Sequence, residues 1–373
     1  MTVMNMKHTI AAAGSLALLL TGAGPVGAAP LTEANVNKGV VELETMGANG
    51  ASVRIGEDLA NVIDDGATRR VIPILGKGSL QNIIDLKALH GIDLAIVQAD
   101  VLDYARQQNL FGGIDRSFTY ITKLYNEELH LLARADIKTV ADLANQTVNV
   151  DVPGAGSGIT TRRLFELLQT PATLTNDDQG MAIEKLRKGE IAAVAFVAGK
   201  PAPLFQGLDG KDGLHLLSIP LNPAITAAFV PTRLTAQDYP GLVPPDQPVD
   251  TVAVGTVLVA ANFPVLSERY RNLATFVDAF FTRFSSLTEP GHHPKWREVN
   301  LAAELPGWIR FAPAAQWLQR NAPVATVNSE DLKTIFARFI EERQQATGGQ
   351  AMTQDQKDEL FNQFQKWQSG QAR

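Results

Sequence analysis

Residues 148–160 read Val-Asn-Val-Asp-Val-Pro-Gly-Ala-Gly-Ser-Gly-Ile-Thr, and this stretch decides the fold. It begins as a strand with alternating β-branched residues, becomes a glycine-rich turn holding Ser157 and Thr160, and runs into a helix from residue 161. The free N–H groups of a first helical turn and the helix dipole favour negative charge there, and glycine lets the backbone come close to a ligand. The stretch therefore predicts an anion site where a strand meets a helix.

The same strand and helix signals alternate through most of the chain. Strands are expected at 71–75, 92–97, 148–152 and 191–197, and helices at about 80–89, from about 101, from 161 and at 181–188. This alternation predicts an α/β fold with mainly parallel sheets flanked by helices. Ligands of such sheets lie outside the carboxyl ends of the strands, where the glycine and hydroxyl turns of this chain fall. Residues 222–249 are rich in proline and are expected to be irregular.

Length and composition bound the class of protein. The 373 residues suit two domains, and contents of 45% hydrophobic and 19% charged residues describe a globular chain. A formal net charge of −6 argues against nucleic acid as a partner, because binding phosphates requires a clustered basic surface. An anionic small ligand needs only one local positive site. The sequence contains no cysteine, which excludes disulfides, thiol nucleophiles and thiolate–metal sites.

The two ends of the chain stand apart from this pattern. Lys7 and His8 precede an apolar run at 10–20 and small residues suited to cleavage, which predicts a signal peptide over residues 1–28 and a periplasmic location. The run is too short to span a bilayer comfortably, so the mature chain is not expected to insert into a membrane. Residues 326–373 predict a C-terminal helical extension, an amphipathic hairpin that packs on the main body or, alternatively, docks a partner or a second copy.

Three of the polar turns are first candidates for a ligand cleft. In the loop at 47–56, Ser52 offers a hydroxyl and Arg54 a bidentate fork for a carboxylate. The alternative for Arg54 is a surface ion pair with Glu57 or Asp58. In the turn at 76–79, Ser79 is expected to cap the following helix while its neighbouring N–H groups serve a ligand. The turn at 156–160, with its serine, glycine and threonine, is the third.

Two further strand ends carry polar side chains. Gln98 ends the strand at 92–97 and can both donate and accept hydrogen bonds, and Asp100 is expected to be a helix N-cap. Lys200 follows the strand at 191–197, where it either neutralises an anion or lies in solvent.

Catalytic, metal and cofactor motifs are weak in this sequence. His292 and His293 are adjacent and so point apart, and no third ligand follows at a recognisable spacing. The Gly154–Gly158 turn lacks a matched histidine for a hydrolase and the third glycine of a dinucleotide loop. We therefore expect a protein that is not an enzyme and that uses neither a metal nor a cofactor.

Taken in order, the motifs resemble the TAXI-type solute-binding proteins, the extracytoplasmic receptors of a class of TRAP transporters. The resemblance covers residues 39–317. It is carried by stretches that are weak alone and specific in their shared order: Arg54–Ala60, Gly76–Asn82, Asp93–Asp100, Leu124–His130, Gly156–Gly158, Lys188–Ala193, Gly199–Pro201 and Tyr239–Gly241.

This resemblance implies a two-lobed periplasmic binding protein fold of type II-like topology with two hinge crossings. Crossings at 128–134 and 251–260 would place residues 36–130 with 255–325 in lobe 1 and residues 131–254 in lobe 2. Family membership implies capture of a small organic anion, a carboxylate or amino acid, and delivery to TRAP membrane subunits. The implied ligand residues are Ser52, Val53, Arg54, Ser79, Asn82, Gln98, Ser157 and Thr160, and the turn residues Gly158 and Lys200 are further candidates.

The sequence departs from the family in the first loop. Members commonly carry tyrosine there, whereas this chain has Ser52, Val53 and Arg54, so the usual ligand does not carry over. A rival hypothesis of another class is a periplasmic sensor or scaffold that presents ligand status to a signalling or membrane partner through its C-terminal hairpin.

Overall fold

The protein folds around one mixed β-sheet with helices on both faces. The computed structural model describes residues 38–66, 68–321 and 353. Within these residues a ten-stranded sheet has the order β2-β1-β3-β10-β4-β7-β5-β6, with β8 paired to β4 and β9 to β10. Its strands are β1 (Val40–Thr45), β2 (Arg70–Leu75), β3 (Leu94–Gln98), β4 (Phe118–Arg134), β5 (Thr147–Asn149), β6 (Thr173–Thr175), β7 (Ala193–Ala198), β8 (Leu214–Leu216), β9 (Val230–Leu234) and β10 (Val249–Ala261).

The helices alternate with these strands along most of the chain, which confirms the predicted α/β class. They include α2 (Ser52–Ile63), α3 (Ser79–Ala88), α4 (Ala99–Gln107), α5 (Ser157–Leu167), α6 (Gln179–Arg187), α7 (Pro223–Ala228), α8 (Glu268–Thr282), α9 (Phe284–Leu287), α10 (Ala312–Asn321) and the 3₁₀ turn η6 (Pro294–Glu298).

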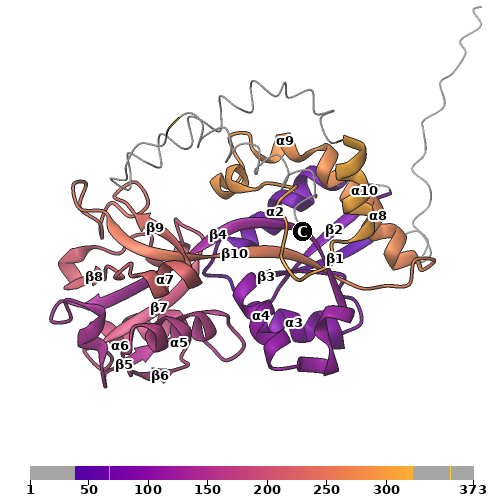
Figure 1. The fold of residues 1–373 in the computed structure, drawn as a ribbon. Coiled ribbons are helices and arrows are strands. Elements are labelled where there is room, and N and C mark those ends of the chain that lie inside the picture. Colours follow the sequence, from indigo (N-terminus) through magenta and orange to yellow (C-terminus); the bar gives the residue numbers. More distant parts are fainter. Residues whose placement is uncertain (1–37, 67, 322–352, 354–373) are drawn as a thin grey trace, which may run out of the picture. The chain divides into compact units, whose positions relative to one another are not determined.

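Strands β4 and β10 join the whole sheet and make it mixed rather than mainly parallel. Strand β1 pairs in parallel with β2 and β3, and β5 pairs in parallel with β6 and β7. Strands β4 and β10 run antiparallel to each other (Figure 1), and β10 also runs antiparallel to β3. The expected parallel groups are therefore present, and the two long strands join them into one sheet.

Two local expectations were wrong. The segment at 222–249 is not irregular throughout, because it contains α7 and β9. Pro223 occupies the first turn of α7, where a missing N–H costs nothing, and Asn222 caps the helix through its side chain. The strand expected at 148–152 ends at Asn149, since the chain turns at Asp151 with a φ of +73°.

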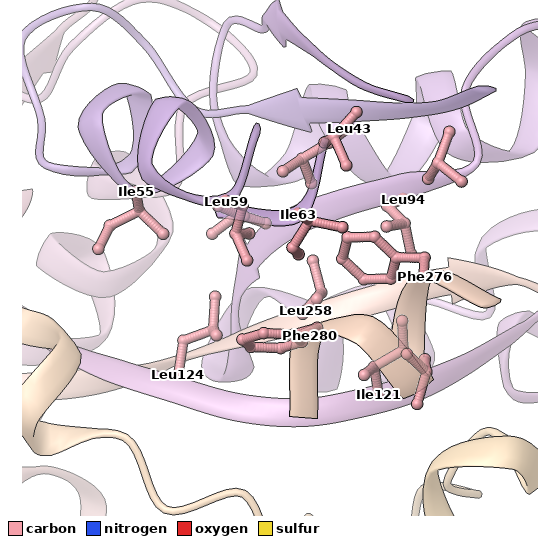
Figure 2. Packing of buried hydrophobic residues seen from close by; sticks show 14 of the residues in the cluster. Leu43, Ile55, Leu59, Ile63, Leu94, Ile121, Leu124, Leu258, Phe276 and Phe280 are labelled. Atoms are coloured by element: carbon pink, nitrogen blue, oxygen red, sulfur yellow. The ribbon is translucent and has the colours of Figure 1, made fainter. Parts of the chain in front are cut away.

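The hydrophobic core consists of four clusters, and β4 and β10 are the strands at which their residues divide. Two clusters draw on residues from Val41 to Tyr125 and from Val257 onward, and the other two draw on residues from Leu129 to Val254. In the largest cluster, α2 and α8 turn apolar side chains toward the sheet, as Figure 2 shows for Ile63, Phe276 and Phe280. Buried residues recur every four positions on α2, at Ile55, Leu59 and Ile63, and every three or four on α8, at Leu273, Phe276 and Phe280. This spacing puts them on one face of each helix.

A buried histidine ties β4 to the segment after β7. The Phe196 carbonyl can only accept, so His130 Nδ1 carries the proton and donates to that oxygen over 3.3 Å. His130 Nε2 then accepts from the Tyr239 hydroxyl at 2.7 Å, and that hydroxyl oxygen accepts the Ala202 N–H. Burial lowers the pKa of His130 to about 4. The ring is therefore neutral in the folded protein at pH 7.

This lowered pKa predicts a loss of stability in mild acid. The unfolded chain binds the proton below about pH 6.5 whereas the folded protein does not, so stability falls as pH drops from 6.5 toward 4. Between pH 7 and pH 5 the contribution of His130 is about 2 kcal/mol. Urea unfolding of the wild type and of His130→Gln at both pH values is expected to show this excess loss in the wild type alone. Equal losses in the wild type and in His130→Gln would contradict the assignment. The exposed His90→Gln control keeps His130 and is expected to lose as much stability as the wild type, so a smaller loss in this control would also contradict it.

The predicted signal peptide (1–28) and the predicted hairpin (326–373, apart from residue 353) lie outside the described residues. In the part of the chain that is described, no helix is long and apolar enough to cross a membrane.

Candidate functional site

A cavity of about 210 Å³ lies at the carboxyl ends of β1, β3 and β5. Three helices begin at its wall, because Ser52, Ser79 and Ser157 are each the first residue of a helix and each line the cavity. The lining runs from Met46 to Gly50 in the first loop, through Gly76–Ser79, to Val152 and Ala155–Ser157 in the glycine turn. The convergence follows from the topology, since the carboxyl ends of parallel strands share one edge.

No side chain caps the starts of α2, α3 and α5. In α2 the first intrahelical bond runs from Ile55 N to Ala51 O, so the N–H groups of the first turn have no partner within the helix. Side chains do cap α7 and α8, which begin away from the cavity, through Asn222 and Ser267. Uncapped N–H groups that converge on one cavity, with the positive ends of three helix dipoles, form an anion-binding wall.

The three serine hydroxyls strengthen this wall. Ser52 Oγ accepts the Met46 N–H at 3.0 Å, and Ser157 Oγ accepts the Val197 N–H at 3.1 Å. A hydroxyl that accepts from the backbone keeps its own proton to donate. Ser79 Oγ likewise accepts the Gln98 N–H at 3.0 Å and contacts Met46 Sδ at 3.2 Å. Ser52 and Ser157 are therefore fixed in position and free to donate a hydrogen bond to a ligand acceptor.

The lining of the cavity also carries carboxyl groups. Burial raises the pKa of Glu127 to about 8 and that of Asp151 to about 6. Asp178 also lines the cavity and caps α6 through the N–H groups of Gly180 and Met181. Among the described lining residues, Lys77 is the one basic side chain, and it is exposed. Positive potential in this cavity thus comes mainly from helix starts.

Gln98 lies between the helix starts and Glu127. Its Nε2 donates to Glu127 Oε2 at 2.7 Å, which orients the side chain across the cavity. Its Oε1 is buried without a hydrogen-bond partner in the described protein. That oxygen points at Gly156, where a Cβ atom would lie 1.7 Å from it. A side chain at 156 would displace Gln98, because the backbone approaches the Gln98 amide so closely.

The glycine turn also contacts the first half of the chain directly. Gln81 N donates to Gly154 O at 3.0 Å, and the Thr160 hydroxyl donates to Asp100 Oδ2 at 2.6 Å. A Cβ atom at Gly78, whose φ is +134°, would lie 2.7 Å from the Ala155 Cα atom. The core clusters divide at β4 and β10, and these contacts join residues from the two sides of that division. They close the cavity that lies between them.

Residues 43–265 match the NMT1-like family. The chain belongs to the NMT1-like family. The matched range contains every residue that lines the cavity, from Met46 to Val197.

This NMT1-like chain is also similar to several solved structures, but the sequence identities are too low to indicate its ligand. The periplasmic binding protein BugD is 14% identical, with 75% of this chain and 93% of that chain covered and a TM-score of 0.46. MatC from Rhodopseudomonas palustris with bound malate is 16% identical, with 75% and 95% covered and a TM-score of 0.45. An ABC uptake transporter substrate-binding protein from Streptococcus pneumoniae with bound histidine is 11% identical, with 69% and 90% covered and a TM-score of 0.42.

The structure brings four of the predicted ligand residues of the NMT1-like chain to the cavity wall: Ser52, Ser79, Gln98 and Ser157. The expectation that Ser79 caps α3 was wrong, since Gly78 holds the cap position and the hydroxyl serves Gln98. Asp100 is not an N-cap either, because α4 begins at Ala99.

The other predicted residues lie off the wall. Asn82 is buried beneath it, where its amide donates to Thr45 O and Ile96 O and so joins α3 to the sheet. Val53 is half-buried on α2, and Gly158 lines a neighbouring cavity with Pro153 and Arg162. Thr160 is engaged by Asp100, and Lys200 pairs with Asp238 at 3.3 Å. None of these residues lines the cavity in the described part of the chain.

Arg54 follows the surface alternative rather than the ligand one. Its side chain is half exposed and lies 3.1 Å from Asp58 Oδ1 and 3.6 Å from Glu57 Oε2. Asp58 is fully buried and accepts from His293 N and Trp296 Nε1, which fastens η6 to α2. The two histidines therefore contribute to a structural contact, and within 38–66 and 68–321 no group of three metal-ligating side chains is placed to hold a metal ion.

Sequence reasoning missed the carboxyl groups of the cavity. Glu127 and Glu128 lie side by side in a strand that is buried along most of its length, and paired charges flanked by apolar residues were the available signal. Asp151 directly follows β5 at the ligand-binding edge of the sheet. Asp178 gave only the ordinary signal of a helix cap.

Proposed function

We propose that this protein is an extracytoplasmic receptor that holds a small organic anion, a carboxylate or amino acid, in this cavity. One observation carries the proposal: three helices begin at the cavity without side-chain caps, and two of them present serine hydroxyls with a proton to donate. Such a wall stabilises negative charge by hydrogen bonds and by helix dipoles. The exposed Lys77 adds a single positive charge at its edge.

In this proposal the core divisions are two lobes that close on the ligand. Residues 36–130 with 255–325 form one lobe and residues 131–254 the other, with hinges in β4 and β10. Ser52 and Ser79 belong to the first lobe and Ser157 to the second, so an anion held by all three favours the closed form. The finer assignment, a TAXI-type receptor exported by a signal peptide and serving TRAP membrane subunits, rests on the sequence resemblance.

The proposal is tested by calorimetric titration of the mature protein with acetate, pyruvate, succinate, malate, aspartate and glutamate. Micromolar or tighter binding of at least one of these carboxylates is expected. Small-angle scattering with that compound is expected to show a smaller radius of gyration than without it. If every carboxylate fails to bind and no organic acid co-purifies with the protein, the proposal is wrong.

Ser157→Ala is expected to weaken carboxylate binding about tenfold or more, because a hydrogen bond to a charged group contributes about 1.5–3 kcal/mol. The matched control is Thr161→Val, which removes a buried hydroxyl of the same helix. This hydroxyl has no hydrogen-bond partner among the described residues and does not line the cavity. That control is expected to bind like the wild type. Equal affinities for Ser157→Ala and the wild type would show that the α5 start does not contact the anion.

A further inference from the structure

Two adjacent glutamates of β4 have opposite electrostatic surroundings. Glu128 is paired with Lys295, whose Nζ lies 2.7 Å from its Oε1, and it also accepts the Lys200 N–H. Glu127 points to the other face of the strand, into the cavity, and is 1% exposed. No ion pair forms at Glu127 among the described residues, so this buried carboxyl group has no cation to neutralise it.

The hydrogen-bond partners of Glu127 are neutral. Gln98 Nε2 donates to its Oε2 at 2.7 Å, and the Tyr125 hydroxyl lies 3.5 Å from its Oε1. Burial raises the pKa of Glu127 more than the bond from Gln98 lowers it, and neutral donors do not balance a full negative charge. The carboxyl group therefore has room for a proton on the side that faces the cavity.

The charged groups around Glu127 are mostly acidic. Asp100 on α4 and Glu128 on β4 both raise its pKa, and Lys295 of η6 lowers it while bonded to Glu128 and Glu298. The other charged residues that line the cavity are Asp151, Asp178 and the exposed Lys77. An incoming carboxylate brings one more negative charge close to Glu127, and two like charges in a buried site cannot both remain ionised.

We propose that Glu127 is a specificity-determining residue that binds the anion as a neutral carboxylic acid and donates a hydrogen bond to a ligand oxygen. This inference rests on the proposed anion-binding function. It adds that pH regulates binding, because the anion binds only while Glu127 holds its proton. No covalent bond changes, and the proton stays on Glu127. A ligand with an ammonium group against this side chain would instead favour loss of the proton.

The proposal predicts how the affinity for an anion changes with pH. Burial raises the pKa of Glu127 to about 8, so the group is neutral at pH 7. A bound anion raises this pKa further, so binding above pH 8 takes up one proton from solvent. Affinity for a simple carboxylate is then expected to fall about tenfold for each pH unit above 8.

The test compares the wild type with Glu127→Gln, which keeps a donor and an acceptor but cannot ionise. Both are titrated with succinate and with aspartate, its amino analogue, from pH 6.5 to 9.5, in buffers of different ionisation enthalpy. For succinate we expect equal affinities within about threefold at pH 7. Above pH 8 we expect proton uptake and the tenfold slope in the wild type only. The exposed Glu304→Gln is the matched control and is expected to keep the wild-type slope.

Each other result overturns the inference in a distinguishable way. Succinate binding by the wild type without proton uptake, or with the same pH slope in Glu127→Gln, removes Glu127 from the site and leaves the proposed function standing. Proton release with aspartate, together with no binding of succinate, assigns Glu127 to an ammonium group instead. Failure of both compounds and of the other carboxylates to bind either protein rejects the proposed function and this inference together.

Discussion

Lys295→Met is expected to lower the free energy of unfolding by about 3–5 kcal/mol, because it leaves a buried carboxylate without its cation. The Lys295 and Glu128 side chains are 2% and 3% exposed. Glu298 also accepts from Lys295 at 2.8 Å and from Asn126 N at 3.1 Å. The turn η6 is therefore joined to β4 at two points, at Glu128 through the ammonium group and at Asn126 through the Glu298 carboxylate. Urea unfolding at pH 7 measures the loss.

Two variants make this prediction specific. Lys211→Met makes the same chemical change at a side chain that is 89% exposed, and its effect is expected to stay below about 0.5 kcal/mol. Lys295→Met combined with Glu128→Gln is expected to recover at least half of the lost stability, because the neutral amide needs no cation and its oxygen still accepts the Lys200 N–H. If the free energy of unfolding of Lys295→Met lies within about 1 kcal/mol of the wild-type value, the attraction between Lys295 and Glu128 does not stabilise the fold.

Gly156→Ala is expected to weaken carboxylate binding by about 100-fold, because the added methyl group prevents the closed arrangement of the cavity. The new Cβ atom would lie 1.7 Å from Gln98 Oε1 and 3.1 Å from Val101 Cγ2. Gln98 cannot move aside without breaking its bond to Glu127, and overpacking of this kind costs about 1–3 kcal/mol. The φ of −76° at Gly156 suits alanine, so the backbone itself is not strained.

This effect should appear in binding and not in folding. Urea unfolding of Gly156→Ala without ligand is expected to match the wild type within about 1 kcal/mol, and scattering with ligand is expected to keep the radius of gyration of the free protein. Gly158→Ala is the control, because its Cβ atom meets Val150 Cγ2 at an ordinary 3.4 Å. Wild-type affinity in Gly156→Ala would mean that the close approach of Gly156 to Gln98 is not needed for binding.

Several features of the fold and the site could be predicted from local sequence. The alternation of apolar strands with amphipathic helices fixed the element order from β2 to β7, because periodicity is a property of neighbouring residues. The serines at 52, 79 and 157 and Gln98 were predicted to share one site, and the structure places all four on the cavity wall. Residues at the carboxyl ends of parallel strands share an edge whatever the details of packing.

Other side chains could not be placed in this way, because their directions depend on partners far along the chain. Arg54 turns from the cavity to Asp58, which in turn holds His293 and Trp296 more than 230 residues away. Lys295 and Glu128 are 167 residues apart, and Gln98 meets Glu127 only because β10 lies between β3 and β4. The sequence by itself determined the α/β class and the polar edge of the sheet through local periodicity and turn chemistry. Only the tertiary structure decided which charges are buried and paired, because desolvation and long-range pairing arise when distant segments pack together.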